Sequence, residues 1–272
     1  MRANNRTAFV TFDLWETLIF DEPEKDDARG RMRYENLQVA LRDCGVKLAK
    51  EDLKRGYELS ASMLQDVWDR NEEVPIIDQI DRIVELAARR PISIQPAWKE
   101  PLERAYVDPI FEIPPELNPD APKVLEELRS RSYRIGLISN TGRSPGEALR
   151  RLLQTYGIMK FFDATLFSNE LRRRKPDRRV FDRAAQMLGT DTVSVVHVGD
   201  GPEADYWGAK NAGMRAILFE PDRLDVSRWS PDSLFVLSRR KRKNNSEILP
   251  EWRIKSLSES VNLLDSLFAA DL

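Results

Sequence analysis

The sequence predicts an α/β fold, namely a doubly wound parallel sheet with covering helices and one inserted group of helices. Short apolar runs alternate with helical patterns from about residue 120 to residue 220, which is typical of parallel strands joined by helices. Residues 21–114, in contrast, carry helical patterns and no convincing strand. The chain therefore combines an α/β core with a helical insertion.

The first predicted strand covers residues 8–12 and ends directly before Asp13. Its residues are apolar and β-rich, as in a strand that is buried on both faces. Four similar runs follow much later, at residues 133–138, 164–167, 193–198 and 215–219. Helical patterns with one apolar face separate them, at residues 122–130, 145–156 and 178–188.

In the insertion, residues 50–71 and 75–90 each place apolar side chains along one face of a helix. Proline-rich stretches at residues 91–101 and 113–119 break the helical pattern and mark the return to the core. We therefore predict a core domain of residues 1–20 and 115–272, and a helical cap domain of residues 21–114.

The tail beyond residue 221 gives weaker signals. Leu234–Leu237 is expected to form a further strand, and residues 256–267 a closing helix. The basic run from Arg239 to Asn245 is interpreted as a solvated loop, since nothing else in the chain indicates a nucleic-acid surface.

Composition narrows the class of protein further. The formal net charge of −2 and the pI of about 5.8 give no general attraction to nucleic acid or to an anionic membrane. The N-terminus shows no apolar signal region, and no stretch approaches the roughly 20 apolar residues of a membrane span. Cys44 is the only cysteine, which fits a reducing compartment. We expect a cytoplasmic protein with no nucleic-acid or membrane partner.

Polar residues follow the predicted strands directly, at the sheet edge where ligands bind in open parallel sheets. Each has an ordinary structural explanation when taken alone; for example, Asp205 would cap a helix over Tyr206–Ala212. Their joint order is far more specific than any one of them. The residues are Asp13, Ser139, Asn140, Lys175, Asp200 and Asp205.

These side chains have complementary chemistry. Asp200 and Asp205, five residues apart after a strand, offer the hard oxygen ligands that suit Mg²⁺. Lys175 can neutralise a phosphate or an aspartate nucleophile. The hydroxyl of Ser139 and the neighbouring amide can donate hydrogen bonds to an anionic oxygen. The preceding Arg172–Arg174 run is interpreted as solvated.

Together the motifs resemble those of the haloacid dehalogenase superfamily, and the resemblance covers essentially the whole chain. The helical insertion after the first strand resembles the α-helical cap of that family. The four matching segments are Phe12–Leu18 (Phe-Asp-Leu-Trp-Glu-Thr-Leu), Ile138–Asn140, Lys175-Pro176, and Gly199-Asp200 through Asp205.

The resemblance implies a Mg²⁺-dependent hydrolase, most simply a phosphatase for a small phosphorylated metabolite, acting as a monomer or homodimer. Asp13 would attack phosphorus and form an aspartyl-phosphate, which water then hydrolyses. The cap would close over the site and select the substrate. The metal would be held by Asp13, Asp200, Asp205 and the carbonyl of Trp15, and the phosphate by Ser139, Asn140, Lys175 and Thr17.

The chain departs from the family pattern at Trp15. Family phosphatases carry there a second aspartate that protonates the leaving group, and indole cannot do this. A positioned acid–base group contributes roughly 10²–10⁴-fold in rate. Glu16 is the nearest replacement in the sequence, and Glu22 or another acid of the cap is an alternative.

Three other interpretations remain open. An aromatic residue at position 15 resembles the 2-haloacid dehalogenase branch, which uses no metal. The phosphonate-cleaving branch uses a lysine of the cap, but none of the candidates is marked out by its context: Lys47, Lys50, Lys54 and Lys99. A non-catalytic binding or regulatory protein is the third. His197, the only histidine, is expected to be structural, and Cys44 is not expected to be a nucleophile.

Overall fold

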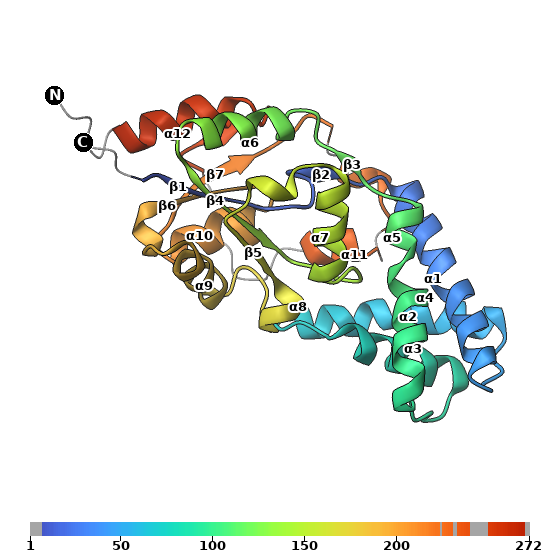
Figure 1. Ribbon diagram of the computed structural model, residues 1–272. Coiled ribbons are helices and arrows are strands. Elements are labelled where there is room, and N and C mark those ends of the chain that lie inside the picture. The colour runs from blue at the N-terminus through green and yellow to red at the C-terminus, as the bar shows by residue number, and fades with distance from the viewer. Residues whose placement is uncertain (1–6, 224, 231–232, 240–249, 270–272) are drawn as a thin grey trace.

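The computed structural model describes residues 7–223, 225–230, 233–239 and 250–269. A sheet lies between two layers of helices, and a further group of helices extends from one end of it (Figure 1). The sheet has six parallel strands in the order β5-β4-β1-β6-β7-β8. The strands are β1 (Phe9–Phe12), β4 (Arg134–Ser139), β5 (Ala164–Phe167), β6 (Val195–Gly199), β7 (Arg215–Phe219) and β8 (Arg253–Ile254).

The strand order reverses at β1. The chain adds β4 and β5 on one side of β1, then crosses over and adds β6, β7 and β8 on the other side. Phe12 pairs with Leu137 of β4 and with Val198 of β6, so Asp13 emerges where these three strands end. Ligands of open α/β sheets bind at such a switch point.

Each face of the sheet packs against its own helices. On one face Val10, Leu137 and Ile217 belong to a core shared with α6 (Ala121–Ser130), α7 (Gly146–Thr155) and α12 (Glu259–Ala269). On the other face Ile138 and Leu218 pack against α9 (Arg178–Leu188), a π-helical turn η4 (Pro202–Trp207) and α10 (Gly208–Asn211). Because both faces of the sheet are buried, the sequences of these strands are continuous apolar runs and do not alternate with polar residues.

The inserted helices have a core of their own. It includes Leu37, Leu53, Ile80, Leu102 and Tyr106. The chain enters and leaves this segment through a short antiparallel pair, β2 (Ile19–Phe20) with β3 (Glu116–Leu117). Treating residues 21–114 as a separate cap domain stays a prediction. The helices are α1 (Pro23–Asp43), α2 (Lys50–Trp68), α3 (Ile76–Ala88), α4 (Lys99–Val107) and α5 (Pro109–Glu112).

The predicted fold class is confirmed, but the tail differs from the prediction in two respects. Leu234–Leu237 belongs to a helix, α11 (Leu234–Arg239), and not to a strand. The Ser233 hydroxyl accepts a hydrogen bond from the Val236 N–H, which caps this helix. The sheet instead ends in the two-residue strand β8, which is too short to show a period. Of the predicted solvated loop, residues 239–245, the prediction is wrong for Arg239, which ends α11 and pairs with Asp200. The rest of that loop lies outside the described residues. None of the helices in the described residues has the length and hydropathy of a membrane span.

Candidate active site

A cleft of about 1400 Å³ lies at the carboxyl edge of the sheet, and the inserted helices form part of its wall. The core contributes Asp13, Trp15, Lys175, Asp200 and Asp205 to its lining, among other residues. The structure therefore brings Asp13, Lys175, Asp200 and Asp205, which come from distant parts of the sequence, together in one cleft. Asn140 also lines this cleft, whereas Ser139 does not.

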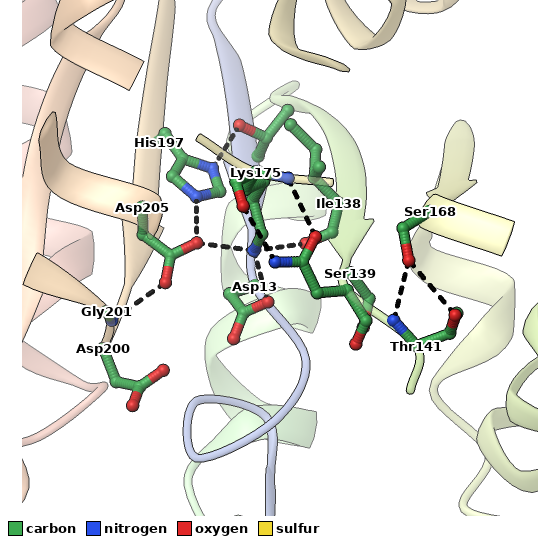
Figure 2. A network of polar contacts seen from close by, with 12 residues as sticks. Asp13, Ile138, Ser139, Thr141, Ser168, Lys175, His197, Asp200, Gly201 and Asp205 are labelled. Atoms are coloured by element: carbon green, nitrogen blue, oxygen red, sulfur yellow. Dashed lines mark hydrogen bonds and ion pairs between the residues drawn. The ribbon is translucent and has the colours of Figure 1, made fainter. Parts of the chain in front are cut away.

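Lys175 lies at the centre of this group, as Figure 2 shows. Its ammonium nitrogen is 2.5 Å from Asp13 Oδ1, 2.5 Å from Asp205 Oδ1 and 2.9 Å from the carbonyl oxygen of Ile138. An ammonium group has three donors, and here each has a protein acceptor. Lys175 thus holds the predicted nucleophile against the end of β4.

Both carboxylate oxygens of Asp205 have hydrogen-bond partners, which fix the orientation of its side chain. Oδ1 accepts from Lys175 and lies 3.1 Å from His197 Nε2, while Oδ2 accepts from the N–H of Gly201 at 2.8 Å. A Cβ at Gly199 would lie 2.5 Å from Asp205 Cγ, so only glycine permits this approach. The helical turn begins at Pro202, so Asp205 lies inside it and does not cap a helix that starts at Tyr206.

His197 has the structural role that was expected. Its ring is fully buried, and Nδ1 lies 2.9 Å from the hydroxyl of Thr11. Through Nε2 it fixes the orientation of Asp205 (Figure 2).

Negative charge is concentrated at the sheet edge. Carboxylate oxygens of Asp13, Asp200 and Asp205 lie within 4.8 Å of one another. Burial, with Asp205 and Asp200 close by, raises the pKa of Asp13 to about 8 even though Lys175 opposes the rise. Burial also raises the pKa of Asp200, whereas Lys175 and His197 outweigh burial and hold the pKa of Asp205 below its usual range.

This cluster suits a divalent cation. Mg²⁺ prefers carboxylate and carbonyl oxygens, and the single ammonium of Lys175 does not balance three carboxylates this close together. Arg239 of α11 forms an ion pair with Asp200. The cation site and Arg239 therefore share one carboxylate.

The remaining predicted contacts lie in different places. Ser139 ends β4 and is buried; its hydroxyl lies 3.3 Å from the Asn140 carbonyl oxygen. The Asn140 side chain donates to the Lys175 carbonyl oxygen and accepts from the Lys175 N–H, so it positions the lysine. Trp15 lines the cleft. Thr17 is fully buried and is not among the residues that line the cleft, and its hydroxyl has no hydrogen-bond partner among the described residues.

Glu16 lines the cleft beside Asp200 and adopts a left-handed backbone conformation, with φ of 57°. Its Oε1 accepts a hydrogen bond from the Asp21 N–H at 3.0 Å. Burial, followed by the charge of Asp200, raises the pKa of Glu16 to about 8, so the carboxyl group is largely protonated at neutral pH. A protonated carboxyl group in a cleft is chemically able to donate a proton.

The prediction that Arg172–Arg174 is solvated is wrong for Arg174. This side chain is buried, forms an ion pair with Glu73 and lies 3.9 Å over the ring of Trp68. Glu73 also accepts from the Trp68 indole N–H and from the hydroxyl of Ser168. A buried polar network therefore joins the inserted helices to the loop that carries Lys175.

Sequence reasoning also missed Arg33, Arg143 and Arg239, all of which line the cleft. Arg143 lies only three residues after Asn140, which is the one local signal that could have indicated it. Arg33 lies on a helix face and Arg239 in a basic run of the sequence. Whether such a side chain is buried depends on how distant segments pack against it.

The profile of the haloacid dehalogenase-like hydrolase family matches residues 8–213. The chain is 37% identical to a glyceraldehyde 3-phosphate phosphatase of Methanothermobacter thermautotrophicus over 40% of this chain and 47% of that protein, so this match spans about half of the relative. It is 30% identical to the pyrimidine 5'-nucleotidase YjjG of Escherichia coli over 92% of this chain and 98% of that protein. The fold matches a 2-haloacid dehalogenase from Pseudomonas syringae with a TM-score of 0.64, at 20% identity, over 96% and 99% of the two chains.

Proposed function

The chain belongs to the haloacid dehalogenase-like hydrolase family, and on that premise we propose that it is a Mg²⁺-dependent phosphatase for a small phosphorylated metabolite. One observation carries the proposal, namely that Lys175 and the carboxylates of Asp13, Asp200 and Asp205 meet at the carboxyl edge of the sheet. Two relatives with phosphate esters in their names, a glyceraldehyde 3-phosphate phosphatase and a pyrimidine 5'-nucleotidase, support the reaction class.

Asp13 is the proposed nucleophile. Asp13 attacks phosphorus in its ionised form, which the ammonium of Lys175 and a bound cation would favour against burial. A P–O bond forms, and the ester P–O bond breaks to release an alcohol. Water then attacks the aspartyl-phosphate, which frees inorganic phosphate and regenerates Asp13. Lys175 holds Asp13 in place for both steps, and Asn140 holds the backbone of Lys175.

The proposed metal ligands are Asp13, Asp200, Asp205 and the carbonyl oxygen of Trp15. When bound, Mg²⁺ neutralises charge on the phosphoryl oxygens and on the surrounding carboxylates. Ser139 is the proposed hydroxyl donor to the phosphoryl group, since it lies at the end of β4 next to Ile138, which accepts from Lys175.

Glu16 is the proposed general acid in place of the missing second aspartate. It lines the cleft, and its carboxyl group retains the proton that a leaving alkoxide needs. Trp15 lines the same cleft but cannot supply this proton, because indole is no acid in this pH range. The Glu16→Gln variant tests this role: a kcat for alkyl phosphates equal to that of wild type excludes Glu16 as the acid.

The inserted helices are the proposed cap, residues 21–114, with the core formed by residues 1–20 and 115–272. Side chains from α1 and α2 line the cleft that contains Asp13, so this segment is placed to exclude water and to contact the part of the substrate beyond the phosphate. A cytoplasmic location and a monomeric or homodimeric state also stay predictions.

A dehalogenase is the second candidate, because Trp15 is aromatic where family phosphatases carry an acid. Its reaction needs no metal, so the cluster of three carboxylates favours the phosphatase. Dependence on Mg²⁺ separates the two activities.

The first experiment is phosphate release from p-nitrophenyl phosphate with Mg²⁺ and with EDTA, in wild type and in Asp13→Asn. Asp222→Asn, at a carboxylate that is 79% exposed, is the matched control. Release that requires Mg²⁺, is retained in the control and is lost in Asp13→Asn supports the proposal. Equal, negligible release from wild type and Asp13→Asn contradicts it, because this leaving group needs little acid assistance.

A further inference from the structure

Two buried arginines line the same cleft as Asp13. Arg33 lies on α1, and Arg143 lies in the loop that follows β4. Their exposed fractions are 3% and 6%. A buried charge is costly unless an opposite charge compensates it, so the partners of these two guanidinium groups are informative.

The partners of Arg33 are neutral. It donates to the Tyr106 carbonyl oxygen at 3.2 Å, to the Tyr57 hydroxyl at 3.3 Å and to the Ser144 hydroxyl at 3.4 Å. The centre of its guanidinium group lies 5.7 Å from the Tyr106 ring. These contacts fix the direction of the side chain without cancelling its charge.

The partners of Arg143 are neutral as well. It donates to the Tyr106 hydroxyl, to the Tyr57 carbonyl oxygen at 3.3 Å and to the Ser60 hydroxyl at 3.0 Å, and it lies 4.0 Å over the Tyr57 ring. The Tyr106 hydroxyl in turn donates to Gln79 Oε1, so it is a protonated phenol. Arg33 and Arg143 thus share two tyrosines, and the centres of their guanidinium groups lie 5.7 Å and 6.0 Å from the Tyr106 ring.

Arg174, another buried arginine of the cleft, differs from Arg33 and Arg143 because it has a carboxylate partner, Glu73. Within the described parts of the chain, neither Arg33 nor Arg143 has a carboxylate within 4.0 Å. A guanidinium carries five N–H groups. Each of the two donates three hydrogen bonds to described residues, which leaves two N–H groups on each without an acceptor among those residues.

We propose that Arg33 and Arg143 form a subsite for a second anionic group of the substrate. The preferred substrates are then phosphate esters that carry a further carboxylate or phosphate group. Both anions offer a pair of acceptor oxygens that match the guanidinium fork. This inference rests on the proposed function, because it assigns the phosphoryl group under attack to Asp13 and the second anion to the arginines.

Two matched pairs of substrates test the subsite in the wild-type protein with Mg²⁺. They are 2-phosphoglycolate against 2-hydroxyethyl phosphate, and fructose 1,6-bisphosphate against fructose 6-phosphate. A kcat/KM at least about 10-fold higher for the member with the second anion, in one pair or both, is expected from hydrogen bonds to a charged group. The pair that shows it identifies the anion as carboxylate or phosphate. Ratios near one in both pairs overturn the inference.

Calorimetric binding of the same four compounds separates this inference from the proposed function. If none of the four compounds is hydrolysed, the proposed function fails. The subsite is then still supported if each compound with a second anion binds more tightly than the matched compound without one. Equal binding within both pairs overturns the subsite, whatever the activity.

Variants then assign the preference to the two arginines. Arg33→Met and Arg143→Met are expected to lower the ratio within the preferred pair by about 10- to 100-fold. Arg143→Lys is the second variant at that position; it keeps a charge and a long side chain over Tyr57 but lacks the planar fork, so a reduced ratio is expected there too. Arg42→Met, at an exposed position of the same helix as Arg33, is the control. Equal losses for both members of each pair show that the arginines only hold the fold, and overturn the inference.

Discussion

Arg174 and Glu73 form an ion pair whose side chains are 6% and 0% exposed, and this pair joins the loop carrying Lys175 to the inserted helices. Removing one partner leaves the other charge buried without compensation, which typically costs about 3–5 kcal/mol. We therefore expect Glu73→Gln and Arg174→Met each to lower the free energy of unfolding by about that amount. Urea denaturation measures this change.

The neighbouring pair of Arg173 and Glu72 supplies the control for that experiment. It joins the same two segments at 3.2 Å, but its side chains are 31% and 41% exposed. Glu72→Gln should cost less than about 1 kcal/mol, since water screens an exposed pair. The double variant Glu73→Gln with Arg174→Met should be more stable than the sum of the single losses predicts. Strict additivity would show that the two side chains are not coupled.

Lys175 is expected to be indispensable for turnover. Lys175→Met removes the one ammonium group that contacts both Asp13 and Asp205. We expect kcat for p-nitrophenyl phosphate to fall by at least about 100-fold, as on removal of a fixed electrostatic group from other active sites. Lys210→Met, at a half-exposed lysine that pairs with Glu251, is the control. A Lys175→Met variant that is folded and fully active would exclude the proposed role.

Arg239 is expected to compete with the metal for Asp200. Arg239→Gln removes the guanidinium that pairs with this carboxylate, so the metal-free protein should lose stability while its affinity for Mg²⁺ rises about tenfold, the equivalent of one charge-assisted hydrogen bond. The rise in melting temperature on Mg²⁺ titration measures that affinity without a substrate. Arg228→Gln, at an exposed arginine that pairs with Glu22, is the control. Weaker Mg²⁺ binding in Arg239→Gln would show that Arg239 supports the cation site.

The sequence was sufficient to identify the strand-end residues, for a physical reason. Asp13, Lys175 and Asp200 each follow an apolar run, and the carboxyl ends of parallel strands necessarily share one edge. The run from Leu234 to Leu237 shows the limit of that reasoning, because four apolar residues fit a helix as well as a strand. Here the Ser233 cap and the stacking of Phe235 on Trp229 accompany the helix.

The buried arginines were out of reach for a different reason. A guanidinium is ordinarily solvated, so the sequence of Arg172–Arg174 favours an exposed run. Arg174 is buried only because Glu73 and Trp68, about one hundred positions earlier in the chain, close over it. Arg33 and Arg143 likewise depend on Tyr57 and Tyr106, which are distant in the sequence. Such partners become visible only once the insertion is packed on the core.

The raised pKa of Glu16 predicts a pH-dependent difference in stability between wild type and Glu16→Gln. Burial raises this pKa from 4.5 to about 8, so the folded state binds a proton that the unfolded chain releases. The stabilisation is fully present below pH 4.5 and is lost as the pH rises through about 8. Glutamine mimics the protonated carboxyl group at every pH and can still accept from the Asp21 N–H. The melting temperature of Glu16→Gln minus that of wild type, measured in EDTA, should therefore increase between pH 5 and pH 9, with exposed Glu126→Gln as the control. If this difference in melting temperature stays constant from pH 5 to pH 9, Glu16 is ionised in the folded protein. The Glu16 carboxylate would then have no proton to give to a leaving group.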